Sequence, residues 1–253
     1  MSRRRFYAPR SASLLNDKAV TLSLEESRHL RDVLRLQRGD EVYVFDGRGR
    51  EDRCVIASVD RDGVTLDRVE EVQPARPESP LKLILGVALL KGEKFDLIVQ
   101  KAAELGVARV APILTTRADV RLRDEEEAKR KTERWRRIVL ESTKQCGRAR
   151  LMGIDAPIAF ESLISRPGPD GELRLMFAER DGTSLAGLVP NLQPRPVEVF
   201  ALVGSEGGWT DDEIAQARAQ SWAIVTFGGR TLRAETAAIV VAALLQHAFG
   251  DLV

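Results

Sequence analysis

Two glycine-rich segments near the C-terminus carry the residues whose types and spacing could support chemistry. The first, at 202–214, reads LVGSEGGWTDDEI, and the second, at 227–246, reads FGGRTLRAETAAIVVAALLQ. Glycine allows positive φ and lets a backbone approach a bound ligand closely. Arginines that can bind anions and glutamates that can accept protons gather around both turns. The segments therefore predict a ligand site, with two ordinary strand-to-helix turns as the alternative interpretation.

Each turn needs a strand before it and a helix after it. The run at 197–203 is almost wholly apolar, as expected of a strand buried on both faces, and 223–227 is a shorter strand. Thr210 and Glu213 form a capping-box pattern that starts one helix, and 234–249 is an alanine-rich second helix. Because open α/β sheets bind ligands beyond the carboxyl ends of their strands, we expect both turns to lie at one edge of a sheet.

Together, GSEGGWTDDE and FGGRTLRAETAA resemble the signature of the RsmE family, the 16S ribosomal RNA uridine-N3 methyltransferases of the SPOUT superfamily. That signature is close to GPEGG(F/L)(S/T)xxE followed by LGxRILRxETA. The segments KGEKFDLIVQKAAELGV and ERWRRIVLESTKQCGR also resemble family blocks, and the similarity spans essentially the whole chain in the family's order. Two departures stand out. Ser205 replaces the usual proline, and Gly229 follows Gly228 where proline is common, so both loops gain freedom in the unbound chain.

The resemblance implies S-adenosylmethionine as cofactor, held by the three loops of a deep C-terminal trefoil knot. On this sequence the loops correspond to 176–179, 203–208 and 227–236. The implied cofactor-binding residues are Met176, Phe177, Ala178, Glu179, Val203, Gly204, Ser205, Glu206, Gly207, Gly208, Phe227, Gly228, Leu232, Arg233 and Thr236.

Methylation of a uridine at N3 requires removal of a weakly acidic proton and alignment of the base with the methyl donor. Arg230 and Arg233 are candidates for anchoring an RNA phosphate or stabilising the deprotonated uracil oxygen. Glu206 and Glu235 are the candidate bases. Glu235 has a second interpretation, in which it holds Arg233 or caps its helix. These four residues are the predicted catalytic group.

Composition narrows the class of protein. The chain has 253 residues, a net charge of +1, 43% hydrophobic residues and 30% charged residues, which is typical of an ordinary soluble protein. Two cysteines fit a reducing, cytoplasmic location, and with only two histidines beside them we expect no metal site. No apolar run approaches the roughly 20 residues of a membrane span, and the N-terminus lacks the apolar core of a signal peptide. Neither GxGxxG nor GxxxxGK(S/T) occurs, so a nicotinamide or phosphate-loop site is not supported.

The pattern of elements predicts two domains. Residues 1–72 contain short alternating strands with tight turns, which suggests a small β-barrel, and the family resemblance implies a PUA-like RNA-binding domain. The proline-rich stretch 73–80 is the expected linker. From 81 to 253, strands alternate with helices, so we predict an α/β domain of the SPOUT type. It would have a largely parallel sheet, helices on both faces and the C-terminal knot.

Several cations are candidates for RNA contact. Residues 3–5 are an arginine triplet, a second set recurs at helical spacing over 28–35, and 117–150 is the most basic region, ending in QCGRAR. A solvated surface explains many of these charges equally well. The predicted RNA-binding residues are Arg3, Arg4, Arg5, Arg28, Arg31, Arg35, Gln145, Arg148 and Arg150.

The family resemblance therefore implies an S-adenosylmethionine-dependent methyltransferase acting on N3 of a uridine in 16S rRNA, with the assembled small ribosomal subunit as substrate. One alternative is a related enzyme that modifies tRNA or another nucleotide, and another is a catalytically silent RNA-binding assembly factor. The family resemblance also implies a homodimer. One apolar stripe of the last helix could form its interface or face the core: Ala237, Val240, Val241, Leu244 and Ala248.

Overall fold

The computed structural model describes residues 3–9 and 18–252, which divide into two compact units. The first contains the chain up to Glu78 together with Thr143–Leu151, and the second contains Ser79–Ser142 and the chain from Met152 onward. The contiguous division predicted at 73–80 therefore misplaced the segment 143–151. Its backbone carbonyls bind the side chain of Arg5, a contact between residues far apart in the sequence.

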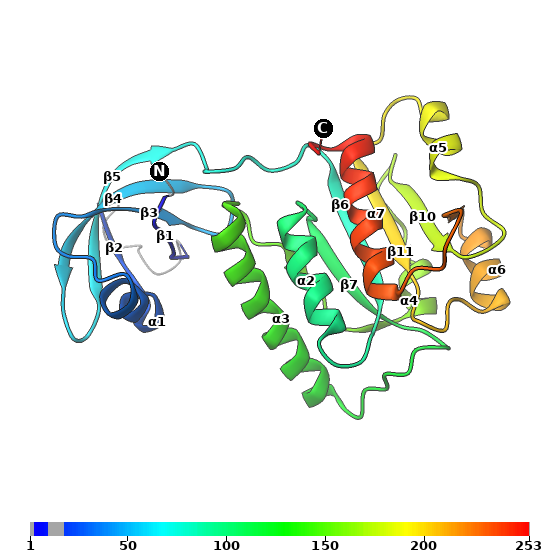
Figure 1. The fold of residues 1–253 in the computed structure, drawn as a ribbon, viewed down its shortest axis with the longest axis horizontal. Helices are drawn as coiled ribbons and strands as arrows, with labels where there is room; N and C mark the ends of the chain where they lie inside the picture. The colour runs from blue at the N-terminus through cyan, green and yellow to red at the C-terminus, as the bar shows by residue number, and fades with distance from the viewer. Residues whose placement is uncertain (1–2, 10–17, 253) are drawn as a thin grey trace. The chain divides into compact units, whose positions relative to one another are not determined.

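The first unit is built on a five-stranded sheet that curls into a half-barrel (Figure 1). Its strand order is β1-β3-β4-β5-β2, with β1 parallel to β3 and the other pairs antiparallel. Two irregularities in the β4–β5 register bend the pair, as bulges do. Phe6, Val42, Ile56 and Leu66 belong to one hydrophobic core cluster. The strands are β1 Arg5–Tyr7, β2 Ala19–Thr21, β3 Glu41–Phe45, β4 Glu51–Val59 and β5 Val64–Val72.

The arginines that recur at helical spacing over 28–35 lie on or just beyond a helix that is interrupted. It comprises α1, Leu24–Arg28, followed by a π-helical turn at His29–Val33, and Arg35 has a φ of +53°. The wider turn changes which side chains share a face, and it accompanies burial of Leu30 and Leu36 in the core. The arginines at 28, 31 and 35 therefore do not form one regular α-helical stripe.

The second unit is an α/β structure around a seven-stranded sheet. The order is β12-β10-β11-β6-β7-β8, with β9 also pairing to β7, and every pair is parallel. The predicted parallel sheet is confirmed, while the two-residue strands β8 and β9 were not expected. The strands are β6 Lys82–Ala88, β7 Arg109–Leu114, β8 Gly153–Ile154, β9 Ile158–Ala159, β10 Leu173–Ala178, β11 Glu198–Val203 and β12 Ala223–Thr226.

Helices cover both faces of this sheet, as predicted. On one face α2 and α7 pack against each other and over β6 and β11, in front of the sheet in Figure 1. On the other face α4 and α6 enclose a core that includes Ile84, Met176, Leu202, Phe160 and Ile214. The helices are α2 Lys94–Glu104, α3 Glu125–Cys146, α4 Phe160–Ile164, α5 Leu185–Leu188, η3 Val189–Asn191, α6 Asp211–Ala219 and α7 Ala234–Phe249. The trefoil knot stays a prediction.

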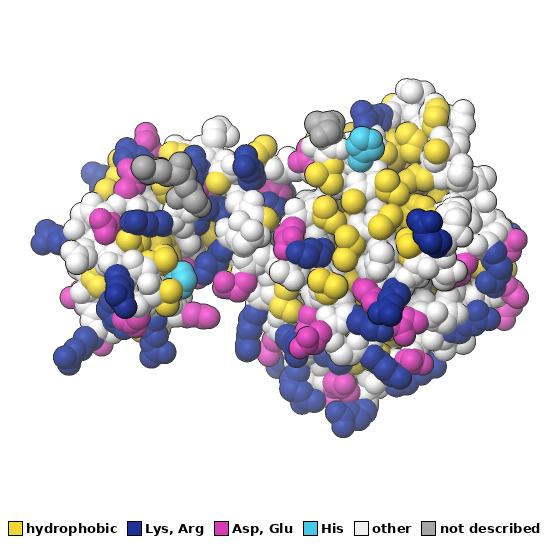
Figure 2. Space-filling model, in the orientation of Figure 1, with side chains coloured by type: hydrophobic (Ala, Val, Ile, Leu, Met, Phe, Trp, Pro, Cys, Tyr) yellow, Lys and Arg dark blue, Asp and Glu magenta, His cyan; other side chains and the backbone are white. Residues whose placement is uncertain are grey.

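The apolar stripe predicted on the last helix divides between two environments. Val241 is fully buried against its own sheet, together with Ala238 and Leu245, so this part of the stripe belongs to the core. Leu244 remains 38% exposed. Figure 2 shows hydrophobic side chains gathered over α7 and toward α5. The core interpretation therefore holds for Val241, while Leu244 lies at the surface.

Two further properties concern the described residues only. None of their helices is both long and apolar enough to cross a bilayer. Among the same residues, no three His, Cys, Asp or Glu side chains gather where they could hold a metal ion.

The centre of the parallel sheet leaves no room for a side chain at Gly86. A Cβ there would lie 2.6 Å from Leu202 and 3.0 Å from Ile113, so we expect Gly86→Ala to lower the free energy of unfolding by about 1–3 kcal/mol. Gly228 has open space around the same position, and Gly228→Ala should change stability by less than about 0.5 kcal/mol. Urea denaturation of both variants measures the difference. Equal stability of the two variants would contradict this account of the core.

Candidate active site

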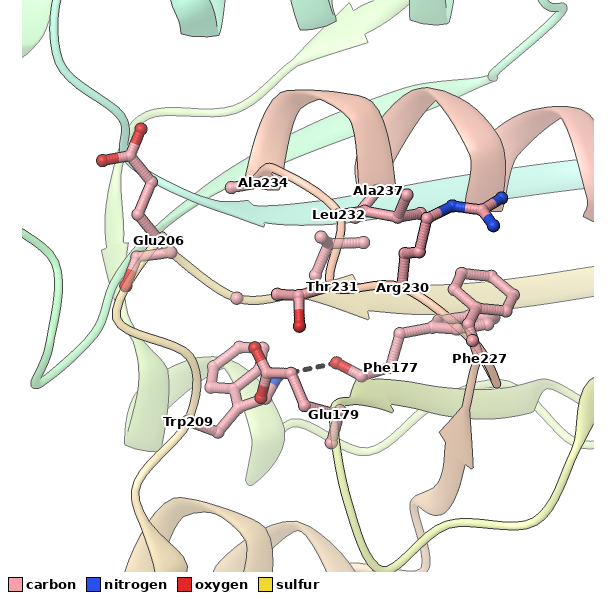
Figure 3. Close-up of a pocket in the computed structure, with 15 residues that line it drawn as sticks. Phe177, Glu179, Glu206, Trp209, Phe227, Arg230, Thr231, Leu232, Ala234 and Ala237 are labelled. Carbon is pink, nitrogen blue, oxygen red and sulfur yellow. Dashed lines mark hydrogen bonds between the residues drawn. The ribbon is translucent and has the colours of Figure 1, made fainter.

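A cavity of about 150 Å³ lies where β10, β11 and β12 end, so the two glycine turns do meet at one edge of the sheet (Figure 3). Three loops and the start of α7 enclose it. Its lining consists of Phe177, Ala178, Glu179, Val203, Gly204, Ser205, Glu206, Trp209, Phe227, Gly229, Arg230, Thr231, Leu232, Ala234 and Ala237.

Trp209 joins two of the loops. Its indole Nε1 donates a hydrogen bond to the carbonyl oxygen of Phe177 at 2.8 Å, shown as the dashed line in Figure 3. The ring is 1% exposed, packs 5.3 Å from the Phe160 ring and covers Gly204, where a Cβ would come within 3.1 Å of the indole. Gly204 is therefore required for the close approach of the ring to the backbone, and the end of β10 is tied to the turn after β11.

The turn at 207–210 is also held by the loop that follows β7. Arg117 donates to the carbonyl oxygens of Gly207, at 3.2 Å, and Trp209, at 3.0 Å. The backbone amide of Thr116 donates to Glu213 at 2.9 Å. Glu213 is buried and completes the capping box of α6 with Thr210, as the sequence predicted. One carboxylate thus links a helix start to a neighbouring loop.

The pocket has the features needed to bind a ligand that joins a nucleoside to an amino acid. The rings of Phe177 and Phe227 lie 5.0 Å apart on one wall and provide an apolar surface for a flat heterocycle. Helix α7 begins at the pocket, and its N-cap, Arg233, makes no side-chain capping bond. The amides of such a helix start favour a carboxylate. The hydroxyl of Ser205 is buried without a hydrogen-bond partner among the described residues. These groups fit S-adenosylmethionine.

Charged side chains gather at one end of the pocket. Lys94, from the start of α2, forms an ion pair with Glu206, and Glu235 and Arg233 lie close enough to shift the pKa of Lys94. The hydrogen bond to Glu206 is the main reason that the pKa of Lys94 is raised. One carboxylate oxygen of Glu235 is buried without a partner in the described structure. Arg230 is separate from this group, because Figure 3 places its guanidinium at the opposite end of the pocket from Glu206.

The lining agrees with much of the predicted cofactor set and differs at identifiable positions. Met176 is fully buried in the core cluster of the second unit and does not line the pocket, whereas Ala178, at the end of β10, does. Five other predicted residues are absent from the lining: Gly207, Gly208, Gly228, Arg233 and Thr236. Sequence reasoning missed Trp209, Gly229, Thr231, Ala234 and Ala237. Ala234 and Ala237 are three residues apart in the first turn of a predicted helix, so they share one face of α7. That spacing was the signal in the sequence from which both could have been predicted to line the pocket.

Two predicted RNA-binding arginines have structural roles in the first unit. The Arg5 side chain is 5% exposed and donates to Glu51 and to carbonyls of 143–148. The Arg148 side chain is 6% exposed and pairs with Glu78 at 2.7 Å. Arg3 also bonds Glu51, at 3.0 Å. These partners were not predictable from the arginine triplet or from QCGRAR alone.

The other RNA candidates lie nearer the surface. Arg31 is half-buried, with its guanidinium donating to the Asp32 carboxylate at 2.7 Å. The remaining five are exposed and stay proposals for RNA contact: Arg4, Arg28, Arg35, Gln145 and Arg150.

The α/β fold and a pocket that fits S-adenosylmethionine indicate a methyltransferase, and comparison with known families assigns the chain to the RNA methyltransferases. A family model described as an RNA methyltransferase domain matches residues 77–246, and one described as an RNA methyltransferase PUA domain matches 22–67. The prediction of a PUA-like first domain is therefore confirmed.

Relatives identify the particular family. Ribosomal RNA small subunit methyltransferase E of Synechocystis is 33% identical over 91% of this chain and 73% of its own length. The protein of the same name from Bacillus subtilis is 29% identical over 91% of both chains. This chain belongs to the ribosomal RNA small subunit methyltransferase E family.

Solved structures agree on the fold and the cofactor. A methyltransferase from Legionella pneumophila, in complex with S-adenosylmethionine, is 30% identical with a TM-score of 0.88. A small subunit methyltransferase E from Neisseria gonorrhoeae, bound to S-adenosylmethionine, is 27% identical with a TM-score of 0.87. Both matches cover 100% of each chain. The cofactor of this RNA methyltransferase is S-adenosylmethionine.

The hydrogen bond from Trp209 should contribute to cofactor affinity. Trp209→Phe keeps an aromatic ring but leaves the Phe177 carbonyl without its donor, so we expect cofactor affinity to fall about 5- to 10-fold, corresponding to about 1 kcal/mol. Trp222→Phe is the matched control, because the buried indole nitrogen of Trp222 has no hydrogen-bond partner among the described residues. Isothermal titration of S-adenosylmethionine into both variants measures the effect. Wild-type affinity in the Trp209 variant would show that the bond does not shape the pocket.

Proposed function

We propose that this enzyme methylates N3 of a uridine in 16S rRNA, with the assembled small ribosomal subunit as its substrate. The observation that supports this proposal is the ion pair of Lys94 with Glu206, which lines the cofactor pocket, together with the nearby charges of Glu235 and Arg233. The small-subunit assignment is supported by the names of the relatives, and the uridine-N3 assignment by the family signature in GSEGGWTDDE and LRAETA. A ribosomal substrate implies a cytoplasmic enzyme.

The chemistry divides between the cofactor and this chain's own residues. Bound S-adenosylmethionine supplies an electrophilic methyl group. The chain must align the base with that group and receive the N3 proton, for which the carboxylates of Glu206 and Glu235 are the candidates. Arg233 stabilises negative charge that develops on a uracil oxygen. The buried, unpartnered oxygen of Glu235 and the exposed position of Glu206 beside Lys94 give these two carboxylates different environments.

We also propose that the active enzyme is a homodimer that uses the exposed face of α7. Leu244, His247 and Ala248 line an apolar groove with Leu185 and Val189. The groove has a volume of about 610 Å³ and shares Phe227 with the cofactor pocket. A second copy seated there would cover exposed apolar surface and lie next to the bound cofactor.

The substrate is tested with 30S subunits from cells that lack this gene. Incubation with the purified protein and S-adenosylmethionine, followed by nucleoside mass spectrometry of 16S rRNA, should show new N3-methyluridine. Arg233→Ala should produce none while keeping the wild-type circular dichroism spectrum. Cofactor binding without a methylated 16S product would redirect the assignment to tRNA or another base. Failure to bind cofactor would favour a silent assembly factor.

The dimer is tested by placing a charge in the groove. Leu244→Glu should shift the protein from dimer to monomer in sedimentation velocity at micromolar concentration, because a carboxylate would be buried in an apolar interface. Leu97→Glu is the matched control, since Leu97 on α2 is 40% exposed against 38% for Leu244. A wild-type protein that sediments only as a monomer would rule out the proposed dimer.

A further inference from the structure

Lys94 occupies a position that helix energetics disfavour. It is the first residue of α2, where its ammonium faces the positive end of the helix dipole, and the N-cap Glu93 makes no side-chain capping bond. A local conflict of this kind often marks a residue retained for function. Because β6 and β11 are parallel neighbours, the start of α2 lies beside the loop after β11, and Lys94 reaches Glu206.

We propose that Lys94 is a catalytic residue that binds one of the two uracil oxygens flanking N3, beside its ion-pair partner Glu206. This inference rests on the proposed uridine-N3 reaction and extends it to a residue of the segment KGEK.

The hydrogen-bonding edge of uracil explains why this pair would suit it. Uracil presents an acceptor, a donor and an acceptor at O4, N3–H and O2. Lys94 offers a donor beside the acceptor Glu206, and Arg233 is a second cation close enough to influence Lys94. Cytosine presents a donor and two acceptors along the same edge, so its exocyclic amine would oppose a cation. The pair therefore provides selectivity for the uracil imide as well as affinity.

The ion pair is placed where substrate can reach it. The side chains of Lys94 and Glu206 are 39% and 48% exposed, so exchanging part of their contact for a base costs little. Glu206 lines the cofactor pocket, whereas Lys94 stands outside that lining. A base bound between them would have its N3 directed toward the pocket. The proximity of Arg233 and Glu235 to Lys94 keeps all four charges within one locality.

The step balances in charge and atoms. The N3–H bond breaks, and its proton goes to a carboxylate, which becomes neutral. The N3 electron pair forms the new bond to the methyl carbon. The bond from carbon to sulfur breaks with its electron pair remaining on sulfur, so the positive sulfonium becomes a neutral thioether. During the transfer, negative charge spreads onto the two uracil oxygens, where Lys94 and Arg233 stabilise it.

The test compares Lys94→Met and Lys94→Arg with wild type in the 30S methylation assay. Lys94→Met should lower kcat about 100-fold, the usual effect of removing one donor to a developing oxyanion, while Lys94→Arg retains most activity. The loss in Lys94→Met should shrink between about pH 7 and pH 9, because more of the imide then ionises without help. Cofactor affinity and the melting temperature should not fall. Lys101→Met, which breaks an ion pair with Glu104 at the other end of α2, is the control and should match wild type.

Any other result of this test would contradict the inference. A rise in KM with unchanged kcat would make Lys94 a phosphate contact, and loss of cofactor binding would show that it acts on the cofactor loop through Glu206. Wild-type kcat in Lys94→Met would leave it no role in the reaction. If wild-type enzyme itself forms no N3-methyluridine, the proposed function fails and this inference fails with it, whereas failure confined to the Lys94 variants leaves the proposed function intact.

Discussion

The hydrogen bond between the Trp209 indole and the Phe177 carbonyl joins the turns that follow β10 and β11, and the cofactor pocket depends on that junction. The parallel register of β10, β11 and β12 brings the three strand ends to one edge, but register alone leaves the loops independent. Trp209 fills the space above Gly204, and Arg117 holds the same turn from a fourth loop. The result is a cavity whose walls come from segments far apart in the chain yet are fixed relative to one another.

Charged residues serve two different purposes in the two units. In the first unit, Glu51 is fully buried and binds Arg3, Arg5 and the amide of Ala75, so its charge is neutralised by contacts within the fold. Removing a partner of such a buried carboxylate would leave its charge uncompensated, which is strongly destabilising. At the cofactor pocket, Lys94 and Glu206 are paired but exposed, and the pair can open toward a ligand. Burial therefore distinguishes arginines and glutamates that maintain the fold from those available for substrate.

Helix α7 connects the pocket, the core and the exposed face of the second unit. Its first turn contributes Ala234 and Ala237 to the pocket, its middle buries Val241 against the sheet, and Leu244 faces outward. This division follows from helical periodicity, which turns successive residues toward different surroundings. A substitution on the outer face of α7 would therefore lie close to the cofactor pocket, because Phe227 lines both the groove and the pocket.

The sequence by itself determined the features that depend on residues close together in the chain. The capping box of Thr210 and Glu213, the span of α7, the parallel strands and the two glycine turns were all predictable, because periodicity and capping are encoded within a few residues. Only the tertiary structure decided that Met176 is buried in the core and does not line the pocket, that Arg5 and Arg148 are structural, and that 143–151 belongs to the first unit. The pairing of Lys94 with Glu206 joins residues 112 positions apart. Such contacts are set by how strands and loops pack against each other, and no local pattern records them.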